Sequence, residues 1–187
     1  MMQPFSSISA GYRRWRHSKG FGVHSPFAYR FVRDVVSAKG CYYASARLSR
    51  LIDGLPRAAR REYSMLFRMV ARLAPHHILL SESADRRLTE SLRLADTRVT
   101  VATCGSKTRG SLRTMTILTS SELRQDMPAH LLDSGNMLVI RNLRVCPAVL
   151  DEAMNQVRGG WIFADKDIAV IISDDAERLN YTDIRMI

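Results

Sequence analysis

The stretch that decides the fold is His77–Thr103, HILLSESADRRLTESLRLADTRVTVAT. It opens with a short apolar run at His77–Leu80 and closes with an alternating apolar and polar run at Val99–Thr103, and both patterns are typical of β-strands. Between them, Ala84–Leu94 gathers its leucines on one face of a predicted amphipathic helix. Strand, helix and strand in this order form the repeating unit of a parallel α/β sheet.

The alternation continues toward the C-terminus. Strands are predicted at Met115–Thr119 and Asn136–Ile140, and helices at Glu122–Leu132, which Pro128 kinks or splits, and at Ala148–Val157. Two final strands, at Ile168–Ser173 and Tyr181–Met186, are predicted to pair across a polar turn. We therefore expect an α/β, Rossmann-like, mostly parallel sheet in residues 76–187, with an antiparallel C-terminal hairpin.

Residues 1–75 are predicted to form a basic helical segment that packs on this domain. Ser25 can cap a helix whose first residue is Pro26, and apolar side chains follow at helical spacing. Further helices are expected at Ser45–Ile52 and Ala58–Leu73, the second ending before Pro75.

Composition limits the class of protein. The 187 residues are 46% hydrophobic and 25% charged, which suits a globular domain. No apolar run approaches the ~20 residues of a membrane-spanning helix, and the widely spaced Cys41, Cys104 and Cys146 predict reduced thiols in the cytoplasm. The formal net charge of +10 is uneven, because residues 1–75 hold half of the 28 lysines and arginines but only three acidic residues.

An N-terminal string gives the most specific resemblance. Gly20-Phe21-Gly22-Val23-His24-Ser25-Pro26-Phe27, followed by the pair Tyr42-Tyr43, resembles the start of some class I S-adenosylmethionine-dependent methyltransferase-like proteins. The resemblance implies a Rossmann-like fold and S-adenosylmethionine as cofactor. It also implies a third strand with its helices, yet only the polar loop Gly105–Arg113 lies between the second and next predicted strands, so the central part is shortened.

The family places acids and glycines at the ends of its strands, and this chain lacks them. After the first strand, Ser81-Glu82-Ser83 stands where a glycine-rich turn would let the backbone approach the cofactor. The later strand ends carry Thr103, Ser120 and Asn142 in place of family acids. By resemblance these six residues line a vestigial cofactor pocket, and no residue is assigned a catalytic role.

His24 is the one candidate on the substrate side of that pocket. Capping by Ser25 and helix initiation by Pro26 explain its neighbours, so a role in packing is favoured over a role in chemistry. The histidines of the chain lack metal-ligand spacing, and no metal site is expected.

Three functions remain open at this stage. The first is a methyltransferase-like protein with lost or weakened cofactor binding, which acts as a structural or interaction protein with a protein partner or as a homodimer near Gly105–Arg113. The second is an active methyltransferase with a divergent pocket. The third is a nucleic-acid-binding module that uses basic residues of the N-terminal segment, namely Arg13, Arg14, Arg16, Lys19, Arg57, Arg60 and Arg61.

Overall fold

The computed structural model describes residues 25–38, 43–104, 113–123 and 127–186. Their strands form one seven-stranded sheet with the order β2-β1-β3-β4-β6-β5-β7. The strands are β1 His77–Leu80, β2 Thr100–Thr103, β3 Thr114–Thr119, β4 Met137–Arg141, β5 Gly160–Ala164, β6 Ile168–Ser173 and β7 Asn180–Asp183.

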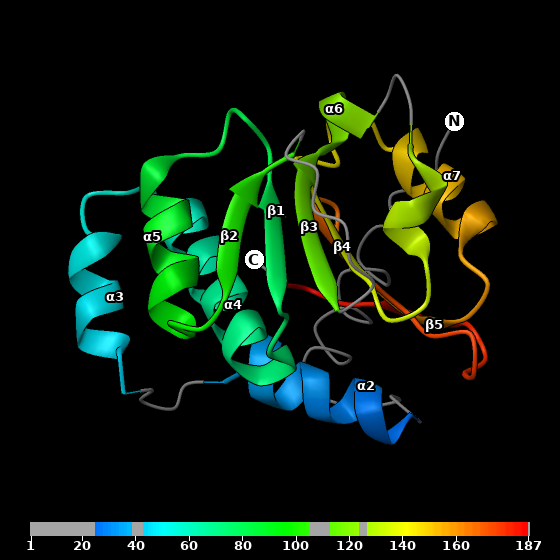
Figure 1. The fold of residues 1–187 in the computed structure, drawn as a ribbon, viewed down its shortest axis with the longest axis horizontal. Helices are drawn as coiled ribbons and strands as arrows, with labels where there is room; N and C mark the ends of the chain where they lie inside the picture. The colour runs from blue at the N-terminus through cyan, green and yellow to red at the C-terminus, as the bar shows by residue number, and fades with distance from the viewer. Residues whose placement is uncertain (1–24, 39–42, 105–112, 124–126, 187) are drawn as a thin grey trace, which may run out of the picture.

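Helices connect and cover these strands (Figure 1). The helices are α2 Pro26–Phe31, the π-helix η1 Val32–Val36, α3 Ser45–Leu51, α4 Arg57–Leu73, α5 Arg86–Ala95, α6 Ser120–Leu123, the 3-10 helix η2 Ala129–Leu132 and α7 Ala148–Gln156. The helix predicted at Glu122–Leu132 is split into α6 and η2, because Pro128 lies directly before η2 in an extended conformation. None of the described helices is long and apolar enough to cross a membrane.

The predicted fold class is confirmed, but its antiparallel pair is made by different strands. β6 runs antiparallel to both of its neighbours, β4 and β5, whereas β7 pairs with β5 in parallel. The final two predicted strands therefore do not pair with each other; the hairpin is β5–β6, closed by a hydrogen bond from the Asp165 N–H to the Ile168 carbonyl at 2.9 Å. β5 itself was not predicted.

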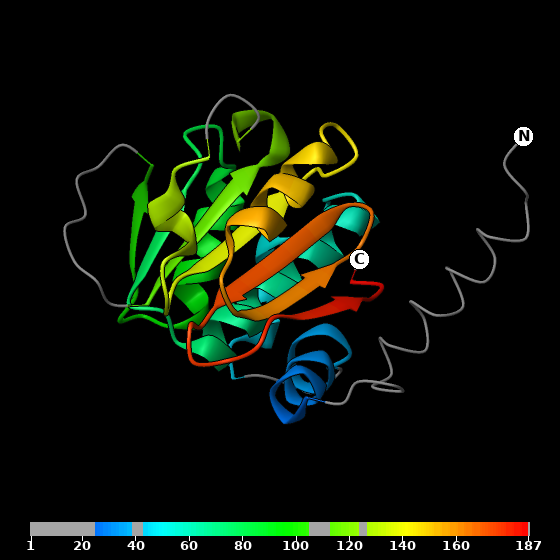
Figure 2. The ribbon, with the colours of Figure 1, turned by 90° about the vertical axis from the view of Figure 1, so that its right-hand side faces the viewer.

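Two layers of helix enclose the sheet. One core joins β1, β3 and β6 side chains to α2, η1, α4 and α5, with Phe67 and Phe163 among its buried members. The other core joins the opposite face to α6, η2 and α7, with Leu138 and Ile171 at its centre. Figures 1 and 2 show α4 and α5 on one side of the sheet and α7 on the other.

The N-terminal helix α2 is fixed to the sheet at β5. The Ser25 hydroxyl accepts a hydrogen bond from the Ala28 N–H at 3.3 Å and another from the Trp161 indole N–H at 3.0 Å. The Phe27 ring lies 4.2 Å from Trp161, and the Phe31 ring stacks on Phe163 at the same centroid distance. Capping by Ser25 is thus confirmed, and the segment starts a helix that packs on the main domain.

The parallel part of the sheet, β2-β1-β3-β4, contains a reversal of strand order. From β1 the chain passes to β2 on one side, and then returns to β3 on the other side of β1. In open α/β sheets, ligands bind outside the carboxyl ends of the strands where the order reverses. The residues that follow β1 and β3 therefore define the candidate site.

Candidate functional site

Ser81 and Glu122 meet at the strand reversal. Ser81 follows β1 and is buried, and its hydroxyl donates a short hydrogen bond to the carboxylate of Glu122 in α6, the helix that follows β3. The Ser81 N–H also donates to the Ile117 carbonyl at 3.2 Å, which ties the two strand ends together. A direct contact between a residue that follows β1 and a residue of α6 thus lies at the strand reversal, where a ligand is expected.

Glu122 is held by a second set of contacts from its own turn. Its other carboxylate oxygen accepts hydrogen bonds from the Thr119 N–H at 2.8 Å and from the Thr119 hydroxyl at 2.6 Å. This Thr-x-x-Glu arrangement is one half of a capping box for α6. Partial burial opposes ionisation of Glu122, but the bonds from Ser81 and Thr119 and the charge of Arg141 outweigh it and lower the pKa of the carboxyl.

The turn after β1 is built on Ser81 rather than on glycine. The Ser81 and Ser83 hydroxyls lie 2.6 Å apart, and the Ser83 N–H donates to the Ser81 hydroxyl at 3.1 Å. Glu82 between them is exposed. Glu82 and Glu122 both contribute to raising the pKa of the Cys104 thiol, although burial is the larger cause. Two carboxylates thus act on the Cys104 thiol at the carboxyl ends of these strands.

The remaining predicted pocket residues divide into two groups. Thr103, at the end of the edge strand β2, is exposed and lies in register with Leu80. Ser120 is fully buried and donates to the Asn142 carbonyl at 2.7 Å, so it joins the ends of β3 and β4. Asn142 is exposed and has a left-handed φ of 55°. Ser81, Ser83 and Ser120 are thus structural hydrogen-bonding residues in this arrangement.

An ion pair closes the same edge beside β4. Arg141, the last residue of β4, donates a short hydrogen bond to Glu62 of α4, and the two side chains are only 17% and 13% exposed. Tyr63, which follows Glu62 in α4, donates a hydrogen bond from its hydroxyl to the Asp85 carboxylate at 3.1 Å. Asp85 in turn caps α5, because its carboxylate accepts a hydrogen bond from the Arg87 N–H at 3.1 Å. Burial of Tyr63 and the carboxylate of Asp85 raise the pKa of its phenol. This network locks α4 and α5 onto the strand ends.

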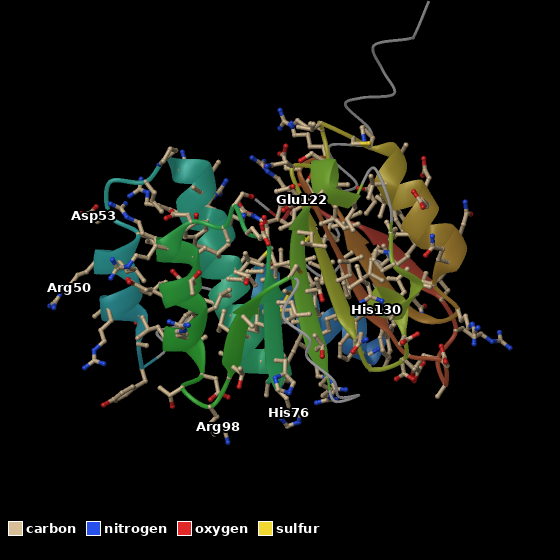
Figure 3. All side chains as sticks on the ribbon, turned by 45° about the horizontal axis from the view of Figure 1, so that its top comes forward. Arg50, Asp53, His76, Arg98, Glu122 and His130 are labelled. Carbon is tan, nitrogen blue, oxygen red and sulfur yellow. The ribbon has the colours of Figure 1, made fainter. Side chains whose placement is uncertain are left out.

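Histidines do not contribute to this edge in the described residues. His76 and His77 lie at the start of β1, and His130 lies in η2, before β4 begins. Figure 3 shows Glu122 at one end of the sheet and His76 near the opposite end. His24 lies outside the described residues. No described histidine lies beside Ser81; the group that accepts a hydrogen bond from its hydroxyl is the Glu122 carboxylate. The described part of the chain contains no cluster of metal-ligating side chains.

Sequence reasoning missed Glu62, Arg141 and Glu122 as members of the site. Two signals point to them. Glu62 lies four residues before Leu66 on the buried stripe of its helix, where a charged residue requires a partner. Thr119 and Glu122 have capping-box spacing directly after a strand.

Comparisons of the chain with protein-family models, with curated proteins and with solved structures find no match.

Proposed function

We propose that this chain is a methyltransferase-like α/β protein that does not bind S-adenosylmethionine and acts as a structural or interaction protein. The observation that carries the proposal is the hydrogen bond between Ser81 and Glu122 across the strand reversal. It places two side chains where the family needs open space above a glycine turn.

Charge supports the same conclusion. The cofactor carries a carboxylate on its methionine part, and this edge of the sheet already holds Glu82 and Glu122. Two like charges about 4 Å apart repel by about 4 kcal/mol at an effective dielectric constant of 20, which corresponds to about a thousandfold in affinity. Arg141 offsets this only in part, because it already pairs with Glu62.

The shortened sheet removes a second part of the expected site. β2 is the end strand of the described sheet, and only residues 104–113 separate it from β3. Ten residues are too few for a helix, a strand and another helix, so the flank that the resemblance implies beside the adenosine is lost. An end strand also presents unpaired backbone groups, and we propose a homodimer or a protein partner on this side.

Titration calorimetry with S-adenosylmethionine and S-adenosylhomocysteine tests the proposal. We expect no binding heat at ligand concentrations up to 1 mM and no rise in melting temperature, since a ligand that binds only the folded state raises that temperature. Micromolar binding of either ligand would refute the proposal. It would instead support an active methyltransferase whose pocket is lined by Ser81, Glu82, Thr103, Ser120 and Asn142.

A matched variant makes a negative titration informative. Glu122→Ala removes the carboxylate from the crevice and leaves the rest of the edge in place. If the Ser81–Glu122 contact were the only obstacle, this variant would bind the cofactor. We expect it to remain without binding, because the glycines and the adenosine flank are still missing; binding by the variant alone would restrict the loss to this one contact.

A further inference from the structure

Exposed arginines gather where α3, α4 and α5 approach one another. Three elements that are separate in the sequence contribute them, and no acidic side chain pairs with any of them in the described part of the chain. The members are Arg47 and Arg50 of α3, Arg57, Arg60 and Arg61 of α4, and Arg87 of α5. We call this set the arginine surface.

Hydrogen bonds hold the three helices in one arrangement. The Arg87 guanidinium of α5 donates to the Asp53 carbonyl in the loop between α3 and α4 at 3.1 Å. The bond between Tyr63 and Asp85 joins the second turn of α4 to the beginning of α5. The C-terminal end of α3 and the first turns of α4 and α5 therefore converge, as Figure 1 shows, and Figure 3 places Arg50 and Asp53 on this side.

All but one of the acids of this region are engaged, so the surface keeps a net positive charge. Glu62 pairs with Arg141, and Glu90 pairs with Arg86. Asp85 caps α5 and accepts from Tyr63. Asp53 is the exposed acid that remains among α3, α4, α5 and their connecting loop.

The beginning of α4 shows that these arginines do not serve helix stability. Arg57, Arg60 and Arg61 lie in the first turns of α4, the first turn contains no acid, and Pro56 supplies no side-chain cap. Cations at this end of a helix oppose the helix macrodipole, by about 0.3–1 kcal/mol each when exposed. An external polyanion would reverse the sign of that contribution, because its phosphates interact favourably with the same end.

The residue types of the arginine surface indicate which class of polyanion it binds. The chain has 28 basic residues, and the lysines among them, Lys19, Lys39, Lys107 and Lys166, all lie outside α3, α4 and α5. Arginine binds phosphate oxygens in a bidentate manner. The exposed large apolar side chains of the described residues are Tyr29, Tyr43, Val145, Leu179 and Tyr181, and none lies within these three helices. An anionic membrane surface would favour inserted apolar residues, and a protein interface would favour an apolar centre.

We propose that the arginine surface binds the sugar-phosphate backbone of a nucleic acid, independently of sequence. The surface adds arginines of α3 and α5 to Arg57, Arg60 and Arg61, which the sequence suggests. The other basic residues that the sequence suggests, Arg13, Arg14, Arg16 and Lys19, lie outside the described residues. The inference does not depend on cofactor loss at the strand reversal.

Fluorescence anisotropy with a labelled 20-nucleotide single-stranded RNA tests it. The test variant is Arg50→Gln/Arg60→Gln/Arg61→Gln. The control is Arg158→Gln/Arg178→Gln/Arg185→Gln, which removes the same charge from exposed arginines elsewhere. Each phosphate contact contributes about −0.7 to the slope of log K against log salt for single strands. We expect the test variant to bind the RNA at least tenfold more weakly at 100 mM NaCl, and its slope of log K against log salt to become shallower by about 2. The affinity of the control variant should change less than threefold.

Four results would overturn the proposal. They are no binding by the parent chain, binding that does not depend on salt, equal weakening by the two triple variants, or tighter binding to phosphatidylserine vesicles than to RNA. Circular dichroism melting of both variants confirms that they fold. Cofactor binding in the calorimetric experiment would refute the proposed function and leave this inference intact, so the two tests fail separately.

Discussion

Ser25 shows how much one side chain can do at the residue scale. The same hydroxyl caps α2 and accepts the indole N–H of Trp161. Removing it leaves a helix N–H and the indole N–H of the buried Trp161 without their partner. Substitutions of this kind cost about 0.5–2 kcal/mol for the cap and about 1 kcal/mol for the hydrogen bond.

We therefore expect Ser25→Ala to lower the free energy of unfolding by about 2 kcal/mol. Urea unfolding followed by tryptophan fluorescence measures it. Ser25→Thr is the control, because threonine keeps the hydroxyl; it should lose less than half as much. Equal stability of Ser25→Ala and the parent chain would contradict the assigned double role.

The ion pair of Glu62 and Arg141 predicts that changing one partner costs more stability than changing both. Both side chains are mostly buried, so removing one partner leaves an uncompensated charge. We expect Glu62→Gln to cost about 3 kcal/mol, the lower end for a buried pair. Glu62→Leu/Arg141→Met should be less destabilising than Glu62→Leu alone. Additive losses in this double-mutant cycle would show that the two residues do not interact.

Glu122 predicts a pH dependence. Its pKa in the folded chain lies below its ordinary value of 4.5, so its contribution to stability is present above pH 4.5 and is lost as the pH falls through the folded pKa. The difference in urea midpoint between the parent and Glu122→Gln should therefore shrink from pH 7 to pH 3. A difference that stays constant over that range would contradict the hydrogen bonds assigned to the carboxylate.

At the scale of elements, β5 depends on the glycine at its start. Gly160 has a φ of 111°, and a Cβ built there lies 2.1 Å from the Ile172 carbonyl oxygen of β6. No side chain fits without moving the β5–β6 pair apart. The glycine thus permits the close pairing of β5 with β6, the hairpin that joins β4 to the end strand β7.

Gly160→Ala should destabilise the chain by more than about 3 kcal/mol, because backbone strain and a backbone clash act together. Gly54→Ala is a matched control: its φ is 75°, and nothing lies within 4 Å of the added Cβ. The control should cost about 1 kcal/mol from the left-handed conformation alone. Thermal unfolding of the two variants separates the contributions, and equal losses would contradict the close approach at Gly160.

The same strand shows where sequence reasoning succeeds and where it stops. The strands β1, β2, β3, β4 and β6 were predicted because apolar runs with polar flanks mark them. β5 offers only Trp161–Ala164 behind the pair Gly159-Gly160, which favours a turn. With β5 missed, β6 had only β7 as a local partner, and the hairpin was assigned to the wrong pair.

The sequence places the predicted site residues at the strand ends, but their contacts could not be predicted. Ser81, Ser83 and Ser120 were identified by position after their strands. Their partners come from other elements, since Ser81 bonds to Glu122, 41 residues away, and Arg141 bonds to Glu62, 79 residues away. A local pattern carries no information on which distant side chain fills a crevice.

At the scale of the whole molecule, the net charge of +10 repels itself. Added salt screens this repulsion. We expect the melting temperature to rise between 20 and 200 mM NaCl, by about 2–4 °C if screening contributes about 1 kcal/mol. The variant Arg158→Gln/Arg178→Gln/Arg185→Gln, with less charge, should show a smaller rise. A melting temperature that falls with salt would mean that attractive ion pairs dominate.

The contact between Ser25 and Trp161 spans 136 residues of sequence. During synthesis at about 5–20 residues per second, the first helix leaves the ribosome roughly 10 s before the strand that receives it. Phe27 and Phe31 have no ring of β5 to stack on throughout that interval. The nascent chain is therefore a natural client for chaperones that shield aromatic side chains, and translation that stops before residue 160 yields a product prone to aggregation.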